Sequence, residues 1–137
     1  MRLWHQSLIP HLDRQRLLGQ HRELCALRGN GWGRPHATVN YVFSHEPELL
    51  VAYHYLIMAE MRERGYNPDP VWMNINWRGN QIGEQADWCN SAIVTDFLMA
   101  AIGGGAMLYP EHDDGYLQEC LENLLAKGVD LYQVMDR

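Results

Sequence analysis

Apolar residues recur at the three- and four-residue spacing of an α-helix in four stretches of this sequence, and this pattern constrains the fold more than any other feature. The stretches span 10–28, 44–65, 87–102 and 114–127. Glycine clusters follow the first and third stretches, at 29–33 and 103–105, and single glycines close the other two. The pattern therefore predicts an all-α fold of about four helices joined by long irregular connections.

Proline and serine residues mark the expected starts of the first two helices. Pro10 suits the first turn of one helix, where a missing N–H costs no hydrogen bond, and Ser44 is a good N-cap for the next. Apolar residues alternate near the end of 29–43, which is compatible with a short strand, but we expect an irregular segment or the approach to a helix there. A length of 137 residues is usual for one domain, so we predict a single compact helical domain over 1–137.

The composition disfavours several classes of protein. No stretch of about 20 apolar residues exists, so we expect no membrane span. The first ten residues lack the basic-then-apolar pattern of a signal peptide, which favours a cytoplasmic location. Three widely spaced cysteines, Cys25, Cys89 and Cys120, argue against a disulfide framework and indicate buried free thiols. The seven histidines match no common zinc spacing, so we expect neither a metal nor a cofactor.

Charge is distributed unevenly along the chain. The net charge of −6 by itself disfavours nucleic-acid binding, but it hides a basic segment. Residues 1–34 contain six arginines and two acidic residues, whereas residues 84–137 contain two basic and ten acidic residues. The basic segment is therefore able to face a phosphate backbone. The alternative is that its arginines only solvate a helix face, and charge alone does not separate the two interpretations.

Two segments carry a resemblance to a known enzyme family. Leu8–Leu24 (LIPHLDRQRLLGQHREL) has a Leu/Gln/Leu pattern that ends in Arg-Glu-Leu. Pro35–Asp69 has a His-x-Thr motif, followed by a helical pattern that ends in Arg-Gly-aromatic-Asn. In this order the two segments resemble the pyrimidine-dimer DNA glycosylase/AP lyase family, the phage-type, dimer-specific endonuclease V.

The resemblance implies a catalytic group at the start of the chain. In that family the N-terminal amine attacks the sugar C1′ of a damaged nucleotide, forms a Schiff base and displaces the base, and β-elimination then nicks the strand. A helix glutamate manages the proton transfers, and Glu23 matches it. Because Arg2 is bulky, we expect the initiator methionine to be retained, so the expected catalytic residues are Met1, Arg2 and Glu23. An α-amine has a pKa of about 7.7–8.0, against about 10.4 for lysine, so more of it is neutral at pH 7.

The resemblance also implies a DNA-binding surface. An arginine beside a glutamate is usually an exposed ion pair of little energetic weight, but Arg22 matches a family residue that contacts phosphates around the lesion. Further candidates for DNA binding are Arg14, Arg16, Arg28 and His36. The expected partner is damaged double-stranded DNA, bound by a monomer without a metal or cofactor.

Two other functions stay open at this point. The acidic last third of the chain would suit a non-catalytic helical module that keeps the fold and binds a protein or a small ligand. His21, Glu23 and His36 would suit a metal-dependent hydrolase, although they form no common zinc motif. DNA affinity that falls steeply with rising salt would separate the repair enzyme from the binding module.

Overall fold

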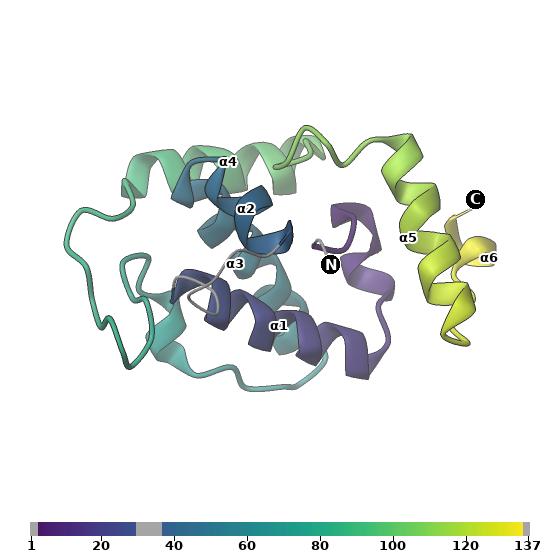
Figure 1. Cartoon of the computed structure of the whole chain (residues 1–137), viewed down its shortest axis with the longest axis horizontal. Coiled ribbons are helices and arrows are strands. Elements are labelled where there is room, and N and C mark those ends of the chain that lie inside the picture. Colours follow the sequence, from purple (N-terminus) through teal and green to yellow (C-terminus); the bar gives the residue numbers. More distant parts are fainter. Residues whose placement is uncertain (1–2, 30–36, 136–137) are drawn as a thin grey trace.

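The computed structural model describes residues 3–29 and 37–135, and within these ranges all regular elements are helices (Figure 1). In chain order, with η for a 3-10 helix, they are η1 (Gln6–His11), α1 (Arg14–Arg28), α2 (Ala37–Phe43), α3 (Pro47–Glu63), η2 (Pro70–Met73), α4 (Ser91–Gly104), α5 (Asp114–Ala126) and α6 (Tyr132–Met135). Trp77 and Glu84 form an isolated antiparallel bridge between η2 and α4. The all-α prediction is confirmed, with more helical segments than the four expected.

Helix α3 is the centre of the fold. Helices α1, α2 and α4 and the short η1 all pack against it, and α1 and α4 lie on opposite sides of it (Figure 1). Residues 49–54 are consecutively buried because these neighbours cover more than one face of the helix. A helix enclosed in this way is apolar around most of its circumference, so the polar residues it does contain need partners.

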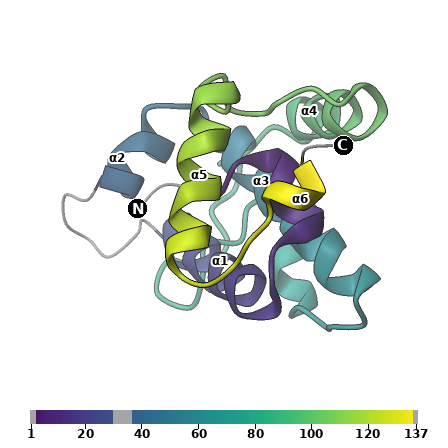
Figure 2. The ribbon, with the colours of Figure 1, turned by 90° about the vertical axis from the view of Figure 1, so that its right-hand side faces the viewer.

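Helix α5 covers the start of the chain. It lies at one end of the molecule, beside η1 and α6 (Figures 1 and 2). Its buried residues Leu121 and Leu124 belong to the same hydrophobic core as Leu3, Leu8 and Leu17. The fold therefore brings the two ends of the sequence together around one set of apolar contacts.

The first long helix begins later than the sequence predicts. Pro10 lies inside η1, and α1 begins only at Arg14. Between them, Leu12 and Asp13 have extended backbone conformations, with ψ values of 138° and 160°. These residues separate the 3-10 helix from the α-helix, so Pro10 lies near the end of η1 and does not begin the helix that we predicted.

The segment before α3 is also more regular than expected. Residues 37–43, for which we expected an irregular segment or the approach to a helix, form α2. Ser44 does not cap α3, because its hydroxyl donates to the carbonyl of Tyr41 (2.7 Å) at the end of α2. Helix α3 begins at Pro47, whose fixed φ and missing N–H suit the first turn.

The last two long helices begin at asparagine and aspartate caps. Asn90 accepts a hydrogen bond from the backbone N–H of Ile93 (3.1 Å), so α4 begins at Ser91 rather than at the predicted Asp87, whose φ is positive (63°). Asp113 caps α5 by accepting from the N–H of Tyr116 (2.8 Å), which confirms the predicted start at 114.

Cysteine burial differs along the chain. Cys89 and Cys120 are buried cysteines outside any disulfide, as predicted, but Cys25 is only half-buried. Among the described residues, none of the helices has the length and apolar character needed to cross a membrane.

Candidate functional site

The first described residues are held by polar side chains from three helices. The N–H of Trp4 donates to Gln20 Oε1 (2.7 Å), and the hydroxyl of Tyr53 donates to the Trp4 carbonyl (2.5 Å) and to Gln20 Oε1 (3.3 Å). The hydroxyl of Tyr116 donates to the Leu3 carbonyl. Gln20 and Tyr53 are fully buried. Leu3 and Trp4 are thus fixed between α1, α3 and α5.

Glu23 lies one helical turn beyond Gln20 on α1. Residues three apart share a helix face, so its carboxylate is on the side of α1 that holds Trp4. Glu23 is half-buried, and burial raises its pKa, while the positive charges of the amino-terminal group, Lys127 and Arg22 lower it. Its own charge acts in turn on Tyr53, whose pKa is raised mainly by burial. We refer to Leu3, Trp4, Gln20, Glu23 and Tyr53 as the N-terminal cluster.

Lys127 also lies at this cluster. Its Nζ is 5.4 Å from the centre of the Trp4 ring, and its charge acts on Glu23. Lys127 is the only lysine of the chain. In the sequence it stands at the end of an acidic helix, far from the first helix, and no motif marks it. Only the packing of α5 on the start of the chain reveals it.

The predicted DNA-binding arginines of α1 lie in different environments. Arg22 and Arg14 are exposed, and the Arg14 guanidinium lies 5.7 Å from the centre of the Tyr66 ring. Arg16 is half-buried and pairs with Asp13 (3.3 Å). Arg28 is fully buried. The predicted site residues Met1, Arg2 and His36 lie outside the described part of the chain.

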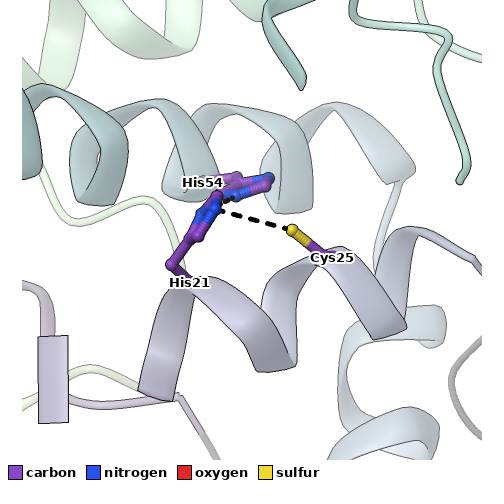
Figure 3. A group of neighbouring side chains, drawn as sticks. All are labelled: His21, Cys25 and His54. Carbon is purple, nitrogen blue, oxygen red and sulfur yellow. Dashed lines mark hydrogen bonds between the residues drawn. The ribbon is translucent and has the colours of Figure 1, made fainter. Parts of the chain in front are cut away.

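Arg28 belongs to a second group of polar side chains, which we call the His54 cluster: His21, Cys25, Arg28 and His54 (Figure 3 shows all but Arg28). Arg28 donates to the carbonyls of Trp72 (2.8 Å) and Asn74 (2.6 Å) and lies 3.1 Å from His54 Nδ1. His54 Nε2 lies 2.9 Å from His21 Nδ1, and His21 Nε2 lies 3.8 Å from Cys25 Sγ. Arg28 thereby ties α1 to both α3 and the η2 segment.

The direction of this chain of hydrogen bonds follows from Arg28. A guanidinium only donates, so His54 Nδ1 accepts, and His54 Nε2–H then donates to His21 Nδ1. His21 Nε2–H in turn points toward Cys25 Sγ. Burial lowers the pKa of both histidines and raises the pKa of the Cys25 thiol to about 12, so all three are neutral near pH 7.

His21, Cys25 and His54 also have the residue types of a metal site, and their ligand atoms lie within 4.8 Å of one another. A metal-bound histidine normally donates its second ring N–H to an acceptor. Here the second nitrogen of His54 faces Arg28, which is a donor and a positive charge. The arrangement therefore suits a neutral hydrogen-bonded chain better than a divalent cation. Of the residues in the hydrolase hypothesis it contains His21 but not Glu23.

A comparison with protein families identifies the chain. The family model described as pyrimidine dimer DNA glycosylase matches residues 1–74, more than half of the 137 residues. The chain belongs to the pyrimidine dimer DNA glycosylase family. The suspected family is thus confirmed, and damaged DNA is its substrate class. Neither a curated protein nor a solved structure matches the chain.

Both clusters lie within the matched range, but two residues that contact the N-terminal cluster do not. Residues 1–74 contain η1, α1, α2, α3 and η2, and hence Gln20, Glu23 and Tyr53 together with the His54 cluster. Helices α4, α5 and α6 lie beyond the match, so Lys127 and Tyr116 come from the part of the chain that the family model does not cover.

Proposed function

We propose that this glycosylase removes a base from pyrimidine dimers or related lesions and nicks the resulting abasic site, using the amine at the start of the chain and Glu23. One observation carries the proposal: Gln20 and Tyr53 hold Trp4 on the face of α1 that also bears Glu23. Three residues separate the amine from this anchor, a reach of roughly 10 Å of extended chain. The terminal amine is therefore within reach of the Glu23 carboxylate.

The chemistry needs a neutral amine and a nearby carboxylate. The amine nitrogen forms a bond to the sugar C1′ as the bond from C1′ to the base breaks, and the base leaves with the bonding electrons and takes up a proton. The bond between C1′ and the ring oxygen then breaks, the oxygen keeps the bonding electrons and takes up a proton, and the nitrogen lone pair completes an iminium ion that the negative charge of Glu23 stabilises. Glu23 then accepts a proton from C2′, and the C3′–O bond breaks, which nicks the strand.

The expected DNA-binding surface is the outer side of α1. Arg22 and Arg14 are exposed there, and Arg16 is partly exposed, so all three can contact phosphates. Arg28 is left out of the proposed surface, because its guanidinium is buried and donates to two backbone carbonyls. Arg2 and His36 stay in the proposal as sequence-based candidates.

The experiment uses duplex DNA with one abasic site and a second duplex with one pyrimidine dimer. The protein should nick both, and borohydride should trap it on the DNA, because reduction of the Schiff base makes the bond permanent. Glu23→Gln keeps the shape of the side chain and should reduce nicking by about 100-fold or more.

Glu63→Gln, an exposed change on α3, is the matched control and should nick at the wild-type rate. A folded wild-type protein that gives no covalent adduct would exclude the lyase activity. Unchanged nicking by Glu23→Gln would remove Glu23 from the mechanism.

A further inference from the structure

Lys127 stands where the end of α5 meets the N-terminal cluster. Its backbone N–H donates to the Leu124 carbonyl (3.0 Å), and Gly128 follows with a positive φ of 86°, so the helix ends at a fixed place. Leu121 and Leu124 anchor this helix in the core. The fold therefore fixes the backbone position of Lys127, although its side chain is exposed.

The indole of Trp4 directs the other end of this side chain. Trp4 is buried, and its backbone N–H donates to Gln20 Oε1, so its ring has a fixed place. The Lys127 ammonium lies 5.4 Å from the ring centre, within the range of a cation–π contact. This contact places the ammonium group of the exposed side chain at the edge of the cluster that contains Glu23.

We propose that Lys127 is a positioning residue for the Glu23 carboxylate, supplying a fixed positive charge that persists when the nucleophilic amine is neutral. This inference rests on the proposed function. An amine must lose its proton before it attacks, so its own positive charge is absent at that moment. Among the described residues, the cations that still act on Glu23 are then Lys127 from α5 and Arg22 from its own helix.

The effect of removing Lys127 on the pKa of Glu23 follows from the groups that surround this carboxylate. The amino-terminal group, Lys127 and Arg22 favour the carboxylate, whereas burial favours the neutral acid. From α3, the Tyr53 hydroxyl is committed to Trp4 and Gln20. In a variant that lacks the Lys127 charge, Glu23 should therefore take up its proton at a higher pH.

The test compares Lys127→Met, which removes the charge, with Lys127→Arg, which keeps it. In Lys127→Met the acid limb of the nicking pH profile should move to higher pH, so that nicking is lost at acidic pH but stays at the wild-type rate on the alkaline plateau. Lys127→Arg should give the wild-type profile. Arg62→Met, which removes an exposed charge elsewhere on α3, is the matched control and should not shift the profile.

A second readout does not depend on activity. The titration of Glu23, followed by carbon NMR of the free protein, should move to higher pH in Lys127→Met and stay in place in Lys127→Arg and Arg62→Met. An unmoved Glu23 titration in Lys127→Met would overturn the inference, even if the protein proved to be no lyase. Loss of borohydride trapping at every pH in both Lys127 variants would also overturn it, because Lys127 would then be the nucleophile itself.

Discussion

The N-terminal cluster and the His54 cluster occupy the same pair of helices, α1 and α3, yet they differ in charge. Each uses buried polar side chains to fix a neighbouring segment: Gln20 and Tyr53 hold Trp4, and Arg28 holds the η2 segment. Only the N-terminal cluster contains a half-buried carboxylate with several cations acting on it.

In the His54 cluster the environment favours the neutral form of every titratable group. Burial lowers the pKa of His21 and His54, raises that of Cys25, and lowers that of Arg28 to about 10. The comparison teaches that burial alone does not mark a reactive site. A site able to stabilise a developing positive charge needs a group that carries negative charge, and of the two clusters only the N-terminal cluster contains a carboxylate whose charged form nearby cations favour.

The largest expected effect on stability comes from Arg28→Met. This change keeps most of the side-chain volume but leaves two carbonyls and His54 without their donor, which should cost about 3–5 kcal/mol of unfolding free energy. Urea denaturation measures it. Arg62→Met removes an exposed arginine and should change stability by less than about 0.5 kcal/mol. Equal effects of the two changes on the free energy of unfolding would mean that the His54 cluster does not stabilise the fold.

Tyr53→Phe should have a smaller effect on stability and a distinct effect on function. The lost hydroxyl leaves the buried Trp4 carbonyl without its donor, at a cost of about 1–2 kcal/mol. Because that bond also positions the start of the chain, nicking of abasic DNA should fall as well. Tyr66→Phe, a partly buried tyrosine outside the cluster, serves as the control for both measurements. Wild-type nicking by a folded Tyr53→Phe protein would show that this anchor is dispensable.

The smallest expected difference is the response of the two clusters to acid. The pKa values of His21 and His54 are below 6.5 in the folded chain, so the unfolded chain takes up protons first and stability falls as the pH drops below about 6.5. The pKa of Glu23 is above 4.5 in the folded chain, so its protonation opposes that loss.

Urea denaturation between about pH 7 and about pH 4.5 should therefore separate the variants. His54→Gln should lose less stability than the wild type on acidification, and Glu23→Gln should lose more at the acidic end. The same slope in all three proteins would mean that neither cluster controls the response to pH.

Much of the fold could be predicted from the sequence, because helical periodicity and terminating glycines are local signals. The starts of α1 and α3 could not, since Pro10 and Ser44 each form local structures that the same residue types also favour. Residues 37–43 alternate in hydropathy, yet they form α2, with Thr38 and Val42 four residues apart on its buried side. Packing against α3 thus outweighs the local pattern there.

The residues of the candidate site also fall into those that the sequence could predict and those that it could not. Glu23 could be found because its Arg-Glu-Leu context is a sequence motif, and the family match now covers it. Lys127 could not, because its contact with Trp4 joins opposite ends of the chain. The burial of Arg28 was equally hidden: an arginine on a basic helix has the same sequence signature whether it faces phosphate or backbone carbonyls.

The central claim is that the amine at the start of the chain, rather than a side chain, forms the bond to DNA. The protein can be trapped on abasic DNA with borohydride, digested with a protease and mapped by mass spectrometry. Since Lys127 is the only lysine, two primary amines compete. The account predicts that the sugar remnant is attached to the α-amine of the N-terminal peptide. Attachment to Lys127, or an undiminished yield from a protein whose α-amine is acetylated, would contradict it.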